Sequence, residues 1–181
     1  RLHYNLGNTY REEGRLDDAE REYKISIELD PALQSAHFNL GLIYAKMGRF
    51  DDAIPEFQKS LELEPSHYKS YNALGLAYKD KGMIDEAIKE HRESLRLNPD
   101  QAEAHNNLGD AYFINKMYKE AEEEFRKALA INSKHAEAWN NLGVSLIMQG
   151  KKEEAVAAWK RSLEINADQP RVKEYIDRNL N

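Results

Sequence analysis

The sequence of 181 residues lacks cysteine, and this absence excludes disulfide bonds, thiolate metal sites and cysteine nucleophiles. Long apolar runs are lacking too. The run from Val144 to Met148 is broken by Ser145, so no segment could span a bilayer. Positive charge is not in excess, because 26 Lys and Arg stand against 32 Asp and Glu, for a formal net charge of -6. Attraction to phosphate backbones is therefore weak, and we predict no nucleic-acid partner and no membrane insertion.

The remaining composition is typical of a thin or elongated fold. Apolar residues make up 41% of the chain and charged residues 32%, a higher charged share than in an ordinary globular domain. A large exposed surface per residue explains this balance, so a deep single core is not implied. The chain begins at Arg1, without Met or a signal-like apolar stretch, and we expect it to be a fragment of a longer protein.

A repeat of 34 residues organises the sequence. Three columns keep one residue type through five units: Gly7, Gly41, Gly75, Gly109 and Gly143; Leu6, Leu40, Leu74, Leu108 and Leu142; and Ala19, Ala53, Ala87, Ala121 and Ala155. A fourth column holds four tyrosines and then a leucine, namely Tyr10, Tyr44, Tyr78, Tyr112 and Leu146. The units are predicted to cover residues 1–33, 34–67, 68–101, 102–135 and 136–169.

Each unit has the apolar spacing of two helices. In the second unit, Phe38, Leu42 and Ala45 follow one helical course, and a similar course begins at Ala53. Glycines that take a positive φ without strain are expected to end the first helix, at Gly14, Gly48, Gly82 and Gly150. In the fourth unit Lys116 replaces this glycine, so we predict a positive φ at Asn115 or Lys116.

A 34-residue helix-turn-helix unit with Leu-Gly, Tyr, Ala, an aromatic residue and Pro at these offsets closely resembles the tetratricopeptide repeat family. The resemblance implies an all-α fold, a right-handed α-solenoid of five helix-turn-helix repeats, with a concave groove lined by the first helix of each repeat. Residues 170–181 depart from the pattern. Their stripe of Val172, Tyr175, Ile176 and Leu180 predicts a C-terminal capping helix with a polar outer face.

We find no catalytic constellation. A Gly-rich phosphate loop, a Gly-x-Ser-x-Gly elbow and a His-Glu-x-x-His motif are absent from the sequence. The acidic run Glu122, Glu123 and Glu124 is interpreted as a solvated helix face. We therefore predict that the chain is no enzyme and has no cofactor and no metal site.

The six histidines are interpreted as structural or surface residues. Three of them, His3, His37 and His105, share a column with Tyr71 and Trp139, which favours packed rings over metal ligands. His91 stands in a column of aromatic residues and is expected to be partly buried. The last two, His67 and His135, fall in the connections between units, where solvated loop residues are expected.

Asparagines line the predicted groove. The column before the conserved leucine reads Asn5, Asn39, Ala73, Asn107 and Asn141, although Asn is a poor helix former. A carboxamide can pair with the N–H and C=O groups of an extended peptide, and this ladder is similar to the one in O-linked N-acetylglucosamine transferase. The alternative is that each Asn caps or bridges neighbouring first helices.

A second family pattern is matched only in part. Chaperone-cofactor modules of this family hold a partner's C-terminus in a two-carboxylate clamp, and Asn8, Asn39 and Lys69 match clamp positions. Tyr4 and Ala73 stand where two basic residues would be required. A tight carboxylate clamp is therefore disfavoured, since a lone lysine is a weak anchor.

The predicted groove is polarised in charge. Units 1 to 3 contribute mainly basic residues, Arg1, Arg11, Lys46, Lys69 and Lys79, against Glu12 and Asp80. Units 4 and 5 contribute Glu103, Asp110 and Glu137 together with apolar Phe113, Ile114, Val144, Ile147 and Met148. A ligand with acidic residues toward one end and an apolar anchor toward the other would be complementary. Alternatively, a second copy or missing sequence covers the apolar residues.

These observations predict a non-enzymatic scaffold or adaptor that binds a peptide segment of a partner protein in its concave groove. The predicted contact residues are Asn5, Asn8, Asn39, Lys46, Lys69, Lys79, Asn107, Asp110, Phe113, Asn141, Val144 and Met148. Two alternatives stay open: a scaffold that self-associates, and the substrate-recruiting arm of a larger enzyme.

Overall fold

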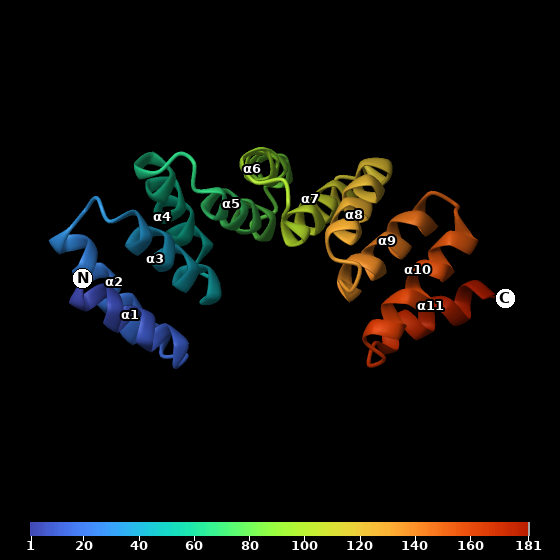
Figure 1. The fold of residues 1–181 in the computed structure, drawn as a ribbon, viewed down its shortest axis with the longest axis horizontal. Coiled ribbons are helices and arrows are strands. Elements are labelled where there is room, and N and C mark those ends of the chain that lie inside the picture. Colours follow the sequence, from blue (N-terminus) through green and yellow to red (C-terminus); the bar gives the residue numbers. More distant parts are fainter. Residues whose placement is uncertain (181) are drawn as a thin grey trace. The chain divides into compact units, whose positions relative to one another are not determined.

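A computed structural model describes residues 1–180, apart from the side chain of Leu180, and all regular structure in this range is helical (Figure 1). The helices are α1 (Leu2–Glu12), α2 (Leu16–Leu29), α3 (Gln34–Lys46), α4 (Phe50–Leu63), α5 (Tyr68–Asp80), α6 (Ile84–Leu97), α7 (Ala102–Ile114), α8 (Tyr118–Ile131), α9 (Ala136–Met148), α10 (Lys152–Ile165) and α11 (Pro170–Leu180). The all-α prediction is confirmed. Asn181, the last residue of the predicted cap, lies outside the described residues.

The repeats are grouped into two compact units, each larger than a single repeat, and the boundary between these two units lies between Leu97 and Asn98. The first unit contains α1 to α6 and the second contains α7 to α11. Within each unit every helix packs against the next one along the chain, and α3 also touches α5, as α7 touches α9. Each of the two units has its own apolar core, built from the facing apolar stripes of the first and second helices of its repeats.

The conserved glycines allow the two helices of a repeat to pack closely. A Cβ atom on Gly41 would lie only 2.6 Å from the ring of Phe57. The ring thus occupies the space that any side chain at position 41 would need. Phe57 is fully buried, and so is Ala53 one turn before it on α4. The repeated glycine and alanine columns therefore serve the packing of the helix pair.

Positive φ angles stop the first helices at the predicted places. Gly14, Gly48, Gly82 and Gly150 have φ angles of 75°, 73°, 77° and 77°. In the fourth repeat, Lys116 takes a φ of 62° in the same position, which confirms the expectation for this connection. The turn geometry is therefore maintained even where glycine is missing.

The last helix covers the end of the second unit. Val172 and Ile176 of α11 are buried, and the ring of Tyr175 lies 5.3 Å from the ring of Trp159 on α10. The side chains of Arg171, Lys173, Glu174 and Arg178 are exposed. This arrangement is the predicted cap with a polar outer face. Among residues 1–180, no helix has both the length and the apolar character needed to cross a membrane.

Candidate peptide-binding surfaces

Asn39 of α3 lies in a hydrogen-bond network that joins α3 to α1. Its amide group donates to Asn8 Oδ1 at 3.0 Å and to the Tyr4 hydroxyl at 3.2 Å, and its Oδ1 accepts from Arg11 Nη1 at 3.1 Å. Asn39 is only 6% exposed, and both of its amide protons are used in these bonds. Asn39 therefore bridges neighbouring first helices, the alternative that the sequence left open.

The same network engages two of the three residues that match the carboxylate clamp, Asn8 and Asn39. Asn8 Oδ1 accepts a second hydrogen bond, from the hydroxyl of Tyr23 at 2.7 Å. Burial raises the pKa of Tyr23 to about 12, so this hydroxyl stays protonated and remains a donor at neutral pH. Lys69 is exposed near the start of α5, with its ammonium group 6.0 Å from the ring centre of Tyr68.

The basic residues predicted for the groove in the first unit differ in their exposure to solvent. Lys46 and Lys69 are exposed, whereas Lys79 is half-buried in the last turn of α5. Arg11 is half-buried and donates to Asn39. Lys46 also lies in a last helical turn, where a cation is favoured by the helix dipole. Exposed positive charge in this unit therefore comes from Lys46 and Lys69 more than from Arg11. Asn5 of α1 is exposed.

In the second unit a chain of amide groups links α7 to α9. Asn141 Nδ2 donates to Asn106 Oδ1 at 3.2 Å, and Asn106 Nδ2 lies 3.5 Å from Glu137 Oε1. Asn107 is buried, while Asn141 and Asp110 are half-buried. The predicted ladder residue Asn141 thus bonds to Asn106, a residue that the sequence reading did not single out.

The apolar residues predicted for the groove divide into two groups. Phe113, Val144 and Ile147 are half-buried and pack against the core of the second unit. Ile114 and Met148, at the ends of α7 and α9, are 46% and 53% exposed. The first helices of this unit therefore present an apolar surface beside polar amides and carboxylates.

Three histidines form pairs with glutamates that the sequence reading missed. His37 Nδ1 lies 2.6 Å from Glu56 Oε2, and its Nε2 lies 3.0 Å from the carbonyl oxygen of Pro31. The corresponding pairs are His3 with Glu22 at 2.7 Å and His105 with Glu124 at 2.6 Å. A signal was present, because each pair is separated by 19 residues. The interpretation as merely packed rings was therefore incomplete.

The interpretation of the acidic run on α8 as a solvated face was wrong. Glu122 and Glu124 are buried, and only Glu123 is exposed. Burial opposes ionisation of both carboxyl groups, but hydrogen bonds lower their pKa values: Lys151 and Gln149 act on Glu122, and His105 and Lys127 act on Glu124. Gln149 and Lys151 lie between α9 and α10, 27 and 29 residues from Glu122, so the sequence position of Glu122 alone could not identify these partners.

The connecting histidines and His91 also differ from expectation. His135 is the N-cap of α9 and accepts from the backbone N–H of Ala138, and His67, before α5, lies 2.7 Å from Ser70 Oγ. His91 is fully buried, and its Nδ1 lies 2.9 Å from Asn72 Oδ1. Burial lowers the pKa of His91 to about 3, with Lys79 contributing.

The described residues contain no group of three His, Cys, Asp or Glu side chains that could hold a metal ion.

A chain built from helix pairs that recur every 34 residues, each with a glycine packed on a ring of the second helix, is an α-helical repeat protein. The chain belongs to the tetratricopeptide repeat family. Sequence models of this family match residues 7–48, 75–116 and 100–168, and further matches cover residues 35–67 and 56–89.

Solved structures share the fold. MamA has 27% sequence identity and a TM-score of 0.83, with 92% of this chain and 97% of that chain covered. MamA from Desulfovibrio magneticus RS-1 has 20% identity and a TM-score of 0.85, covering 93% and 95% of the two chains. YrrB, described as having an unusual peptide-binding site, has 22% identity and a TM-score of 0.80, covering 95% and 89%. No curated protein sequence matches the chain.

Proposed function

We propose that the chain is a non-enzymatic scaffold that binds a peptide segment of a partner protein on its first helices, in the groove that these helices line in the family. The observation that carries this proposal is the surface of α7 and α9, where exposed Ile114 and Met148 adjoin half-buried Phe113 and Val144. Asp110 and Asn141 flank these apolar groups and can orient a bound segment. YrrB, a structural neighbour described by its peptide-binding site, is consistent with such a role.

The first unit contributes charge to this proposal. Exposed Lys46 and Lys69 favour acidic residues of the partner, mainly by accelerating association. Each unit thus has its own preference: Lys46 and Lys69 of the first unit favour carboxylates, and α7 and α9 of the second unit favour an apolar anchor.

The asparagines have two proposed roles. Asn5 is exposed and can contact a peptide backbone with its whole carboxamide. Asn39 and Asn107 are buried, and Asn39 uses both amide protons within the chain, so it can offer a peptide only the second lone pair of its Oδ1. We therefore expect Asn39→Ala to weaken binding mainly by loosening the contact of α1 with α3.

Peptides selected from a random display library, and then made synthetically, test the proposal by fluorescence anisotropy. Met148→Ala should weaken binding by about 1 to 2 kcal/mol, because it truncates the exposed apolar anchor. Charge reversal at Lys46 and Lys69 should slow association and flatten its salt dependence. Lys89→Ala, on the exposed face of α6, is the matched control and should have no effect.

Self-association is separated by the same variants. If a second copy covers the apolar surface, light scattering will show a mass that rises with concentration, and Met148→Ala will shift it toward the monomer. Unchanged peptide binding in all first-helix variants would show that the peptide binds elsewhere on the chain.

A further inference from the structure

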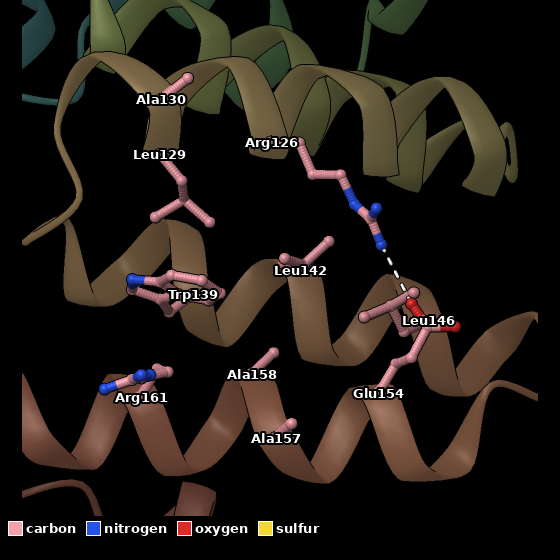
Figure 2. Close-up of a pocket in the computed structure, with 10 residues that line it drawn as sticks. All are labelled: Arg126, Leu129, Ala130, Trp139, Leu142, Leu146, Glu154, Ala157, Ala158 and Arg161. Carbon is pink, nitrogen blue, oxygen red and sulfur yellow. Dashed lines mark hydrogen bonds and ion pairs between the residues drawn. The ribbon is translucent and has the colours of Figure 1, made fainter.

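A pocket of about 560 Å³ opens between α8, α9 and α10, on the second unit (Figure 2). Apolar side chains from all three helices form most of its lining: Leu129, Ala130, Trp139, Leu142, Leu146, Ala157 and Ala158. Charged groups complete it, with Arg126 and Glu154 near Leu146, and Arg161 near Trp139 at the other end (Figure 2). The site is therefore an apolar pocket with a cationic group at each end.

The pocket lies on a different face of α9 from the proposed peptide surface. Trp139, Leu142 and Leu146 follow one another at helical spacing and face the pocket. Val144 and Met148 follow a parallel course shifted by two residues, which corresponds to about 200° around the helix. Occupation of the pocket therefore goes beyond the proposed function and does not depend on it.

The pocket exists because the fifth repeat lacks two side chains that every earlier repeat has. In the column of Leu146 the earlier repeats carry Tyr10, Tyr44, Tyr78 and Tyr112. In the column of Ala158 they carry Glu22, Glu56, Glu90 and Glu124. An aromatic ring and a carboxylate are thus both replaced by smaller apolar groups in the fifth repeat.

The second and fourth repeats show how these two groups are held. In the second repeat, the ring of Tyr44 is buried below the guanidinium of Arg49, with Lys24, the counterpart of Arg126, 5.8 Å from the ring centre. In the fourth repeat, Glu124 is held by His105 at 2.6 Å and by Lys127 at 2.7 Å. Trp139 and Arg161 occupy the columns of His105 and Lys127, so the fifth repeat keeps a cation but has lost the carboxylate.

Arg161 is free to accept a new partner. Its side chain is 64% exposed, and it pairs with the equally exposed Glu164 one turn later, at 2.7 Å. Such an exposed pair contributes little to stability, so a ligand carboxylate can replace Glu164. Arg126, at the other end, is already bonded to Glu122 at 2.8 Å and to Glu154 at 3.1 Å.

We propose that this pocket binds an aromatic side chain of a partner protein that lies next to a carboxylate. The ring takes the space left by the missing tyrosine, against Leu142 and Leu146, where Arg126 can lie over its face. The carboxylate takes the place of the missing glutamate and pairs with Arg161. The partner thus supplies the two groups that the chain itself supplies in its other repeats.

Three blocked dipeptides test the chemistry by ¹H–¹⁵N NMR titration of the whole chain: acetyl-Asp-Phe-amide, acetyl-Asn-Phe-amide and acetyl-Asp-Ala-amide. The first should shift the indole N–H of Trp139 and the amides that surround the pocket. Loss of the carboxylate should weaken binding by about threefold to tenfold, and loss of the ring by about tenfold or more. Equal binding of the Asp-Phe and Asn-Phe peptides would overturn the proposal, as would no binding of the first at concentrations on the order of 10 mM.

Variants of the chain test the location. Leu146→Tyr restores the ring that the four earlier repeats carry and should abolish binding by filling the pocket. Ala157→Glu changes an exposed residue at the pocket edge, repels the probe carboxylate and decides the matter if the first variant does not fold. Lys173→Ala changes an exposed residue of α11 that does not line the pocket, so it is the control and should bind normally. Binding that survives both Leu146→Tyr and Ala157→Glu, or shifts confined to Phe113 and Val144, would overturn the proposal.

Discussion

The first four repeats and the fifth repeat are the same in their inner contacts and differ on the outer side of the helix junction. In all five, a glycine of the first helix packs on an aromatic or histidine ring of the second, as Gly41 packs on Phe57. The first four repeats each carry a tyrosine and a glutamate at this junction, and the fifth repeat carries Leu146 and Ala158 in their places. The comparison shows that contacts within a helix pair are constrained by packing, whereas side chains at the junction can change and create a site.

The third repeat deviates in a different way, because His91 replaces the buried aromatic ring. Its pKa is lowered to about 3 by burial, against an ordinary value of 6.5. Between these pH values the unfolded chain binds a proton that the folded chain excludes, so stability decreases as the pH falls from 6.5 toward 3. This repeat is therefore expected to be the acid-sensitive one.

The largest effect is expected for His91→Phe, which makes the third repeat like the fourth. The free energy of unfolding of the wild type should fall between pH 7 and pH 4.5 by about 3 kcal/mol more than that of the variant, at about 1.4 kcal/mol per pH unit. Urea unfolding at both pH values measures this difference. The reverse change, Phe125→His, should confer the same acid sensitivity on the fourth repeat. Parallel pH profiles of wild type and His91→Phe would refute the assignment.

The next effect tests how tightly the inner contacts of the third repeat are packed. Ala87 is fully buried, so Ala87→Leu should overpack the helix pair and reduce the free energy of unfolding by about 1 to 3 kcal/mol. Lys89→Leu, on the exposed face of the same helix, should change it by less than about 0.5 kcal/mol. Thermal unfolding compares the two, and equal losses would mean that the faces of α6 are misassigned.

A reciprocal exchange sharpens the comparison of the fifth repeat with the second. Tyr44→Leu should open a pocket in the second repeat and cost about 1 to 2 kcal/mol, because a buried ring is lost. Leu146→Tyr should be neutral or stabilising by about 0.5 kcal/mol, since it adds apolar contact in existing space. Urea unfolding of each single variant gives both numbers. A strong loss for Leu146→Tyr would indicate that the fifth repeat cannot accept the ring of the others.

The smallest effect concerns the turn of the fourth repeat. Lys116 has a φ of 62°, which strains a residue with a Cβ atom, so Lys116→Gly should stabilise the chain by up to about 1 kcal/mol. Calorimetric melting measures the change. Gly82→Lys, the reverse exchange in the third repeat, is the matched control and should be destabilising. Marked destabilisation by Lys116→Gly would contradict the role assigned to this turn.

The amino-acid sequence by itself determined the helix pairs, the turns and the cap. A positive φ was expected at Asn115 or Lys116 and occurs at Lys116, because turn geometry depends on neighbouring residues along the chain. Likewise, the stripe containing Val172 and Ile176 was enough to predict the buried face of α11. Such features are local or periodic, so a single sequence contains the whole signal.

Only the tertiary structure decided which polar side chains are engaged and where the surface is hollow. Asn39 bonds to Asn8, 31 positions away, and Glu122 accepts a hydrogen bond from Lys151, 29 positions away. The pocket beside Trp139 arises from absences on two helices at once, Leu146 on α9 and Ala158 on α10. Periodicity identifies the face on which a side chain lies, but its partner depends on helix packing, and that packing brings together residues from separate helices.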